Sequence, residues 1–471
     1  MTDVFLVTVD SLRYDRCGFA GYRYDTTPTL DALAAEGVTF TRAMAPGPRT
    51  SESVPGIISS RLSADCGYID EESYTALPHD TETLAKWLGE VGYETLAILS
   101  NPQLSPARNF DYGFDTFRNH RINEQGDRFT DAGDATAGGN DVLDTARALL
   151  QRLNDSPLPL NPTRVAYVVY RLRQLADWPT VDGAAVIDDL LSEVEHADTP
   201  VFAWTHLNDL HTPLHPERVR AGGLVDAGNM RQFWDDAKRV EHTPAPGYER
   251  AYDSMVRYVD TQLDRLVTRL KEQGRWDDAL VIVTADHGES MHDRGYYGHH
   301  AGANQRLCYS DRDYLHHDLL HVPLIVKPPG GASGAVTEPV SLCWLHELIA
   351  DAVSLPRGDF QNTSGSDPGP LTAYEPAQPV VSDSLTDRGH TVVAHSPAGT
   401  VYTNADQSTD SGWWFFPPNN GGEHSPHSVK DAPDELRAAC QSAKTDPEAV
   451  PEVSAQIDAG ARSRLQELGY L

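Results

Sequence analysis

Acidic and imidazole side chains directly follow two apolar runs that have the pattern of buried strands. Asp10 follows the run 3–9, and Asp286 and His287 follow the run 279–285. Because parallel strands end at the same edge of a sheet, we expect these three groups to converge. Carboxylates and an imidazole that meet there would need a cation between them. The pattern therefore predicts one divalent metal ion, with Mn²⁺ or Zn²⁺ favoured and Ca²⁺ or Mg²⁺ as further candidates.

The stretch GPRTSESVPGIISS, residues 47–60, could supply a reactive hydroxyl. An apolar run with a helical pattern follows it. Ser53 is the predicted N-cap, because this choice puts Pro55 in the first turn, where proline is tolerated. Thr50 then lies just ahead of the helix, where its hydroxyl could contact the metal and act as a nucleophile. Simple polar capping is the alternative interpretation of Thr50.

The elements that must position these groups alternate along the chain. Apolar runs typical of buried strands are separated by segments with helical periodicity, such as 252–270. This alternation predicts an α/β fold with a large, mainly parallel sheet covered by helices on both faces. The expected strands are 3–9, 94–100, 200–207, 279–285 and 322–328, and further helices are expected at 26–37 and 82–93.

Changes in composition divide the chain into two predicted domains. Residues 1–335 are expected to form the catalytic α/β domain. Residues 120–198 interrupt the alternation of strands and helices in this domain. They predict a helical insertion over the edge of the sheet that carries the site. Glycine, proline, serine and aspartate become common after about residue 330, so residues 336–471 are expected to form a smaller α+β subdomain.

The chain is strongly acidic. It has 38 lysines and arginines against 69 aspartates and glutamates, a formal net charge of −31, and only six of the cations are lysines. Acidity combined with few lysines indicates adaptation to concentrated salt, where self-repulsion is screened. A surface of this charge argues against nucleic-acid binding. An anionic substrate must therefore be attracted by local cations.

The cysteines and the hydropathy indicate in which cellular compartment the protein is expected. The five cysteines are scattered and none form a C-x-x-C pair, so no disulfide framework or zinc ribbon is expected. No apolar span of about 20 residues and no charged leader region is evident, so no transmembrane segment is expected. The cytoplasm is the expected location.

Seven pieces of the sequence resemble the sulfatase branch of the alkaline phosphatase superfamily. They occur in that family's order across most of residues 3–330: LVTVDSLRYD, TPTLDALAAEGVTFTRAMAPGPRTSESVPGIIS, FAWTHLNDLHTPLHP, YDSMVRYVDTQL, VIVTADHGES, YYGHH and LLHVPLIVKPPG. The resemblance implies a metal-dependent hydrolase of sulfate or phosphate esters. It also implies metal ligation by Asp10, Asp286 and His287, with Thr50 at the nucleophile position and a metal contact.

The resemblance implies roles for further side chains. His211 matches a histidine that would protonate the leaving oxygen. His299 falls where many sulfatases have a lysine that contacts the ester. Arg13, Asn101 and His206 are the expected substrate-binding residues.

The nucleophile segment departs from the family pattern. Typical sulfatases carry C/S-x-P-x-R, whose first residue is oxidised to formylglycine. Here Thr50 is followed by Ser51, Glu52, Ser53 and Val54, so neither the oxidisable residue nor the arginine is present. Ser11 also replaces the second aspartate of many sulfatases. An unmodified threonine resembles superfamily members that act on phosphorus esters.

The predicted function is a metal-dependent sulfatase-family hydrolase that cleaves a sulfate or phosphate-type ester through Thr50. The expected substrate is a small-molecule, glycan-linked or lipid-linked anionic ester. One alternative is a phosphodiesterase or phosphotransferase with one or two metals, the second held by Asp209, His211 and His299. The other alternative is a degenerate, non-catalytic member that binds an anionic glycan.

Overall fold

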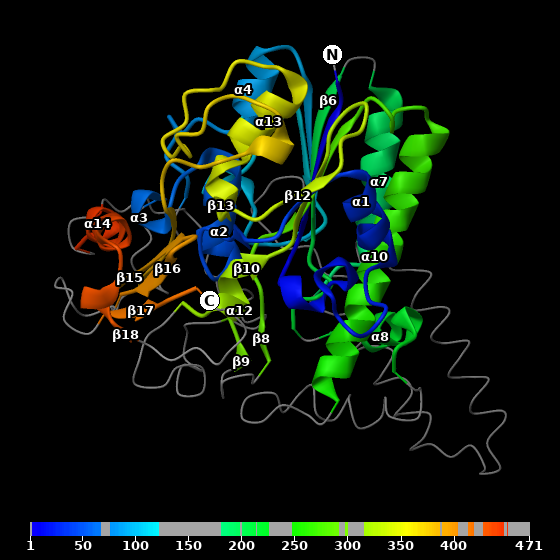
Figure 1. The fold of residues 1–471 in the computed structure, drawn as a ribbon. Coiled ribbons are helices and arrows are strands. Elements are labelled where there is room, and N and C mark those ends of the chain that lie inside the picture. The colour runs from blue at the N-terminus through cyan, green and yellow to red at the C-terminus, as the bar shows by residue number, and fades with distance from the viewer. Residues whose placement is uncertain are drawn as a thin grey trace, which may run out of the picture.

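The computed structural model describes residues 2–66, 76–121, 180–197, 200–212, 214–225, 247–291, 297–299, 315–386, 389–403, 413–418, 427–446 and 450. An eight-stranded sheet, in the order β12-β2-β11-β7-β1-β6-β4-β5, forms its centre (Figure 1). Five neighbouring strands, from β7 to β5, run parallel, and β11 is antiparallel to both β7 and β2. The predicted mainly parallel sheet is therefore confirmed. Its strands are β1 Val4–Val9, β2 Val38–Phe40, β4 Glu94–Leu99, β5 Thr116–Asn119, β6 Val201–Leu207, β7 Leu280–Ala285, β11 Leu324–Lys327 and β12 Gly334–Val336.

The three central strands are buried along their whole length and are mainly apolar, because helices cover both of their faces. Every residue of β1, β6 and β7 is buried. The parallel register pairs Val9 of β1 with Leu207 of β6 and with Ala285 of β7. The residues that follow these three strands therefore emerge at one edge of the sheet, next to one another.

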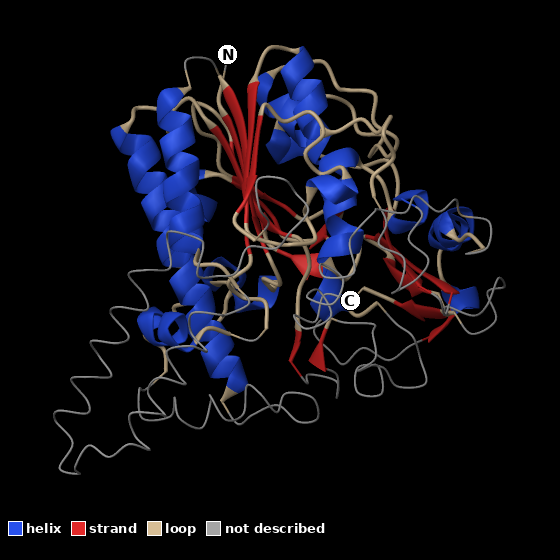
Figure 2. Ribbon diagram, turned by 180° about the vertical axis from the view of Figure 1, so that it is seen from behind, coloured by secondary structure: helices blue, strands red, loops and turns tan. Residues whose placement is uncertain are grey.

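Helices pack on both faces of the sheet (Figures 1 and 2). One face carries α1 Pro28–Glu36, α7 Gly183–His196 and α10 Tyr248–Glu272, and the other carries α2 Thr50–Ser59, α4 Leu84–Glu90 and α13 Leu345–Val353. The longest of these helices, α10, buries the stripe predicted from its periodicity. That stripe comprises Tyr252, Val256, Val259, Leu263, Leu266 and Leu270.

Helix α7 lies within the insertion predicted at 120–198, which stays a prediction. Its buried residues Val186, Ile187, Leu190 and Val194 have helical spacing, and the helix packs on β4 and β6. It is therefore part of the helical layer that covers the sheet, and its apolar stripe is buried by the sheet itself. Residues 122–179 of the predicted insertion lie outside the described part of the chain.

The C-terminal part forms a second, antiparallel sheet in the order β14-β15-β16-β17-β18, with α14 packed on it. These elements are β14 Val380–Thr386, β15 Gly389–Ser396, β16 Gly399–Tyr402, β17 Trp414–Phe416, β18 His427–Ser428 and α14 Asp434–Ala443. A small apolar cluster that includes Val392, Val401 and Leu436 lies between α14 and the sheet. The main core, however, continues past residue 335 through α13. The domain boundary at 335 stays a prediction, and this packing favours a later one.

Shorter elements complete the fold. Strands β3 Ala43–Met44, β10 His321–Val322 and β13 Val340–Ser341 form a three-stranded sheet, and β8 Ser290–Met291 pairs with β9 Tyr297–Gly298. The short helices are α3 Ser63–Cys66, α8 Pro216–Gly222 and α12 His317–Leu320. None of the helices in the described part of the chain has the length and apolar character needed to cross a membrane.

The turn after β1 is held in place by the long helix α10. Ser11 has a left-handed backbone, with φ of 61°, which is uncommon for a residue other than glycine. The hydroxyl of the buried Tyr252 donates to the carbonyl of Ser11 at 2.6 Å and accepts from the amide of Arg13 at 3.2 Å. One side chain therefore satisfies two buried backbone groups of this turn.

Replacing Tyr252 with phenylalanine should destabilise the protein by about 1–3 kcal/mol, because both backbone groups would lose this partner in the interior. Chemical denaturation would measure the change in the free energy of unfolding. Tyr112→Phe is the matched control, because Tyr112 is 39% exposed. Equal stabilities of the two variants would contradict the assigned role of the Tyr252 hydroxyl.

Candidate active site

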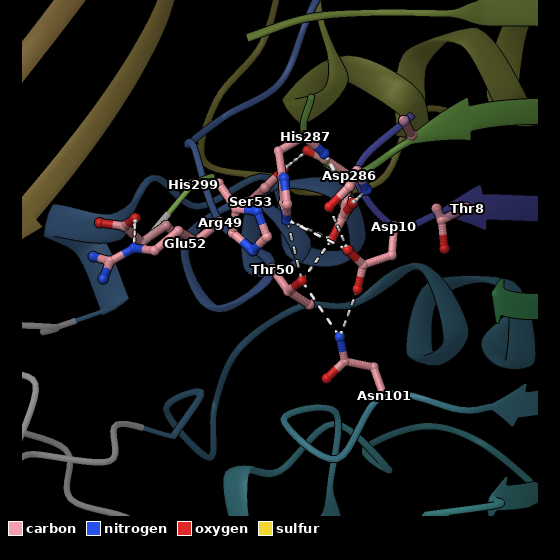
Figure 3. Close-up of polar contacts among 12 residues, drawn as sticks. Thr8, Asp10, Arg49, Thr50, Glu52, Ser53, Asn101, Asp286, His287 and His299 are labelled. Carbon is pink, nitrogen blue, oxygen red and sulfur yellow. Dashed lines mark hydrogen bonds and ion pairs between the residues drawn. The ribbon is translucent and has the colours of Figure 1, made fainter. Parts of the chain in front are cut away.

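Asp10, Asp286 and His287 meet at the edge of the sheet where β1 and β7 end (Figure 3). All three are buried, and one potential ligand atom of each lies within 4.8 Å of the others. The Nε2 atom of His287 lies 3.8 Å from Oδ1 of Asp10 and 3.5 Å from Oδ2 of Asp286. The structure thus brings these three residues together, as the strand ends led us to expect.

The chemistry of these three groups fits a divalent cation. The Nδ1 atom of His287 lies 2.8 Å from the carbonyl of Gly288, which can only accept a hydrogen bond. Burial opposes a charge on His287, but the carboxylates of Asp286 and Asp10 raise its pKa above the ordinary value, so a proton on Nε2 balances their charge when no cation is bound. With that proton removed, Nε2 presents its lone pair to the two carboxylates. Two carboxylates and a lone pair that face one another in the interior repel unless a cation lies between them. Oxygen and imidazole ligands suit such an ion, and metal binding here stays a prediction.

The two carboxylates differ in their electrostatic surroundings. Burial alone would raise the pKa of Asp10, but the imidazoles of His206, His211 and His287 hold that pKa well below its ordinary value. Burial raises the pKa of Asp286, and the negative charge of Asp10 raises it further, against the opposing effect of His287. Asp10 is therefore the carboxylate more strongly held in the ionised form.

Thr50 is the first residue of α2 and adjoins this cluster. Its hydroxyl donates to Oδ2 of Asp286 at 2.8 Å and lies 3.4 Å from Nε2 of His287. The side-chain amide of Asn101 lies 3.4 Å from the same hydroxyl oxygen. The reactive hydroxyl predicted from residues 47–60 thus lies beside the candidate metal ligands (Figure 3).

The predicted N-cap of α2 is wrong. Arg49 is the N-cap, because its carbonyl accepts from the amides of Glu52 and Ser53. The hydroxyl of Ser53 instead donates to the carbonyl of Asp286 at 2.5 Å. Pro55 consequently lies in the second turn, and Thr50 lies within the first turn rather than ahead of the helix. The local sequence pattern assigned the hydroxyl of Ser53 to capping. In the fold this hydroxyl binds the carbonyl of Asp286 instead.

Two of the predicted substrate contacts lie against Asp10. Asn101 follows β4, and its amide donates to Oδ2 of Asp10 at 3.0 Å. His206, in β6, places Nε2 3.6 Å from the same oxygen, while its Nδ1 lies 2.9 Å from the hydroxyl of Thr8. Both side chains are fully buried. They are positioned to orient Asp10, and a direct contact of either with substrate stays a prediction.

The third predicted substrate contact, Arg13, links two turns. Its guanidinium binds the carboxylate of Asp15 through Nε at 2.8 Å and Nη2 at 2.6 Å. Its Nη1 atom donates to the carbonyl of Glu289 at 3.0 Å. These contacts tie the turn after β1 to the loop after β7, and substrate binding by Arg13 stays a prediction.

His211 and His299 extend the site beside His287. The ring centroid of His299 lies 4.4 Å from that of His287 and 5.3 Å from that of His211. Burial lowers the pKa of His299 well below its ordinary value, and the positive charges of His287 and His211 lower it further. The three imidazoles therefore line one side of the cluster, although they come from the loops after β6, β7 and β9.

The geometry does not favour the alternative second metal site. Oδ1 of Asp209 accepts from Arg218 at 3.1 Å and from the amide of Gly183 at 3.2 Å. This carboxylate is therefore bound to the first residue of α7 and to α8. Among the described residues, Asp10, Asp286 and His287 form the one cluster with metal-ligand spacing.

Glu289 is a buried residue of the site to which the sequence alone assigns no role. Its buried carboxylate lies 3.0 Å from Nδ1 of His299. The signal was present, because Glu289 ends the same DHGE segment that supplies Asp286 and His287. Which histidine it would meet depends on the pairing of β8 with β9.

Comparison with known proteins identifies the family of this chain. The sequence profile of the family described as Sulfatase matches residues 2–354. The chain belongs to the sulfatase family. This sulfatase-family chain is 25% identical to the steryl-sulfatase of Mus musculus over 392 residues, which are 73% of this chain and 61% of that protein. It thus spans about three fifths of the length of that relative.

Solved structures show the same fold in other proteins. The phosphonate monoester hydrolase of Agrobacterium radiobacter superposes with a TM-score of 0.56 at 17% identity, over 100% of this chain and 96% of that one. Ps i-CgsB, in complex with k-i-k-neocarrahexaose, superposes with a TM-score of 0.58 at 15% identity, over 99% and 97% of the two chains. The expected alkaline phosphatase and sulfatase-like architecture is therefore confirmed.

Removal of one carboxylate should abolish stabilisation by metal. After treatment with EDTA, the wild-type protein should gain about 2.7 kcal/mol of unfolding free energy at an Mn²⁺ concentration about 100 times the dissociation constant. Asp286→Asn should gain almost none, because the amide removes one anionic ligand. Denaturation with and without Mn²⁺, and bound metal by mass spectrometry, would measure this.

The control for this experiment is Asp25→Asn, because the side chain of Asp25 is 69% exposed. It should respond to Mn²⁺ as the wild type does. Metal content in Asp286→Asn equal to that of the wild type would rule out Asp286 as a ligand.

Proposed function

We propose that this chain is a metal-dependent hydrolase that cleaves a sulfate or phosphate-type ester with Thr50 as its nucleophile. The observation that carries the proposal is the position of the Thr50 hydroxyl, 2.8 Å from Asp286 and 3.4 Å from His287. A hydroxyl used only for capping would bond to the amides of its own helix. Thr50 instead donates its proton toward a buried carboxylate at the edge of the sheet.

Asp10, Asp286 and His287 would hold the metal ion, with Thr50 beside them. When bound, the ion supplies positive charge that makes the Thr50 hydroxyl more acidic and balances the charge of the ester oxygens. Asn101 and His206 keep Asp10 in position through its Oδ2 atom. The site is buried, which strengthens each of these interactions relative to water.

The first half-reaction is an in-line displacement. Thr50 gives its proton to the Asp286 carboxylate with which it already shares a hydrogen bond, and its oxygen bonds to sulfur or phosphorus. The bond from that atom to the leaving oxygen breaks, and His211 supplies the proton for the leaving alcohol or phenol. Helix α2 is ten residues long. The backbone amides at its N-terminus would face the transferred anion.

The proposed role of Thr50 is consistent with the absence of the formylglycine pattern from residues 50–54. A threonine in place of cysteine or serine would serve as an unmodified hydroxyl nucleophile, forming a covalent ester that water or an acceptor alcohol then resolves. Unmodified hydroxyl chemistry suits phosphate-type esters as well as sulfates. The substrate is an anionic ester of a small molecule, or one linked to a glycan or lipid, and the glycan complex of the similarly folded Ps i-CgsB supports the glycan option.

Thr50→Ala should lower the rate by at least about a thousandfold, or about 4 kcal/mol in activation free energy, because the attacking atom is lost. Hydrolysis of p-nitrophenyl sulfate, phosphate, phosphonate and phosphodiester should be measured at high salt with Mn²⁺, Zn²⁺ or Ca²⁺. Thr50→Ser should keep part of the activity, since it retains a hydroxyl.

Ser51→Ala is the matched control for this experiment, because it removes the neighbouring hydroxyl from the same turn. It should leave both the rate and the metal content near the wild-type values. Full activity in Thr50→Ala would contradict the proposed nucleophile. Binding of a sulfated glycan by a wild type that is inactive on every ester would favour the non-catalytic alternative.

His211→Gln should discriminate between leaving groups. A phenyl ester needs protonation of its leaving oxygen far more than a p-nitrophenyl ester does. We therefore expect a loss of about a hundredfold for the phenyl ester and less than about tenfold for the p-nitrophenyl ester. Equal losses on the two esters, measured as kcat/KM, would show that His211 is not the proton donor.

A further inference from the structure

The first turn of α2 lies between the two sheets of the protein. Thr50 and Ser53 are three residues apart, so their side chains lie on the same face of this turn. Both donate to Asp286 at the end of β7, Thr50 to its carboxylate at 2.8 Å and Ser53 to its carbonyl at 2.5 Å. Glu52 leaves the turn on another side, and its pair with Arg49 points away from Asp286 (Figure 3). The large sheet therefore holds only one side of the turn.

The carboxylate of Glu52 is bound to the C-terminal sheet. This side chain is fully buried, although it carries a carboxylate. Its Oε1 atom accepts from the hydroxyl of Ser384 in β14 at 2.7 Å, and its Oε2 atom accepts from Nε of Arg49 at 2.7 Å. Each oxygen thus has a donor, and the two donors come from different parts of the chain. Glu52 thereby connects the first turn of α2 to a strand more than 300 positions away.

The chain that leads into the turn also lies against β14. The amide of Asp383 donates to the carbonyl of Pro46 at 2.8 Å. A Cβ atom on Gly47 would lie 2.7 Å from Cβ of Glu52 and 3.1 Å from the carbonyl of Asp383, which is closer than packed atoms approach. The backbone of residues 46–47, the side chain of Glu52 and β14 are therefore packed in direct contact.

Stability alone does not account for a charged residue at this position. A buried ion pair often stabilises a fold no more than apolar side chains of the same volume do, because both charges must leave water. Contacts that a carboxylate makes with a hydroxyl and a guanidinium have instead a defined direction. The C/S-x-P-x-R pattern has a proline here, whose ring restricts φ of its own backbone. In this chain Glu52 takes that place, and contacts with distant residues restrain the turn.

We propose that Glu52 is a positioning residue through which the C-terminal sheet holds the hydroxyl of Thr50 in line for attack. This inference rests on the proposed function. Ser384 and Arg49 fix the carboxylate of Glu52, and the fixed side chain resists rotation or displacement of the first turn of α2. A shift of about 1 Å at a reacting atom can slow a reaction about a hundredfold. Glu52 therefore acts on the rate through the backbone that carries Thr50.

Kinetics of three variants separate positioning from packing. Glu52→Ala should lower kcat about 10- to 100-fold and leave KM and bound metal near the wild-type values, because the groups that bind them are retained. Glu52→Gln should recover most of that loss, since its amide can bond to both partners. Ser384→Ala should lower kcat by less, about 3- to 10-fold, because Arg49 still binds the carboxylate. It also tests the proposal if Glu52→Ala does not fold.

Glu347→Ala is the matched control for Glu52→Ala. Glu347, in α13, is an equally buried carboxylate that also binds a serine hydroxyl and an arginine, those of Ser364 and Arg357. Its loss should lower stability and leave kcat unchanged. Equal losses of kcat in Glu52→Ala and Glu347→Ala, or no recovery in Glu52→Gln, would overturn the proposal.

Thr403→Val is the matched control for Ser384→Ala. The buried hydroxyl of Thr403 accepts from the amide of Val392 at 2.7 Å, beside the same sheet. This variant removes a buried hydrogen bond that does not reach α2, so it should keep its kcat. A kcat for Ser384→Ala equal to that of Thr403→Val would contradict the role assigned to Glu52.

Hydrogen exchange tests the contact with β14 without any substrate. The amides of Glu52 and Ser53 donate to the carbonyl of Arg49 within the turn, at 3.0 and 2.8 Å. In Ser384→Ala the peptide that covers residues 49–60 should exchange about fivefold faster, because one hydrogen bond that opposes local opening is lost. The peptide that covers α7 should exchange as it does in the wild type.

The exchange measurement keeps this inference separate from the proposed function. Unchanged exchange of residues 49–60 in Ser384→Ala would overturn the positioning role even in an active enzyme. Faster exchange in Ser384→Ala together with full activity in Thr50→Ala would confirm that β14 holds the turn, and would reject Thr50 as the nucleophile. Faster exchange, a lower kcat in Ser384→Ala and an inactive Thr50→Ala would support both proposals.

Discussion

The burial of Asp10 and Asp286 side by side is the constraint on which the rest of this site depends. Parallel pairing of β1 with β7 places the two carboxylates at adjacent strand ends, where neither is exposed. Like charges in the interior repel strongly, so the arrangement persists only with compensating groups around it. His287 and His206 approach from two sides, and Asn101 and Thr50 each donate a hydrogen bond to one of the two carboxylates.

The smaller C-terminal sheet contributes to the site through α2. In β14, the hydroxyl of Ser382 donates to the carbonyl of Ala45 at 2.7 Å, and the amide of Asp383 donates to Pro46. The hydroxyl of Ser384 donates to the buried carboxylate of Glu52 in the first turn of α2, which also binds Arg49. The second sheet thereby fixes the segment that presents Thr50. Its role is to hold the hydroxyl against the carboxylates of the first sheet.

The net charge of −31 makes the local electrostatics of the site more important. The proposed substrate, an anionic ester, would be repelled by such a surface, so groups beside the candidate active site must attract it. The ring of His299 lies 5.3 Å from that of His211 and 4.4 Å from that of His287, measured between centroids. His287 can supply positive charge there, because Asp286 and Asp10 raise its pKa against the opposing effect of burial. The first turn of α2 adds the partial positive charge of its amides.

Apolar runs and periodicity are local properties of the chain. They were enough to predict the buried strands, the apolar stripe of α10, and the placement of Asp10, Asp286 and His287 at strand ends. Which distant group each polar side chain contacts depends instead on how the elements pack against one another. Ser53 binds the carbonyl of Asp286 instead of capping α2, and Glu289 meets His299 through the pairing of β8 with β9. A hydroxyl or carboxylate has many acceptable partners, and the fold chooses among them by bringing one of them within reach.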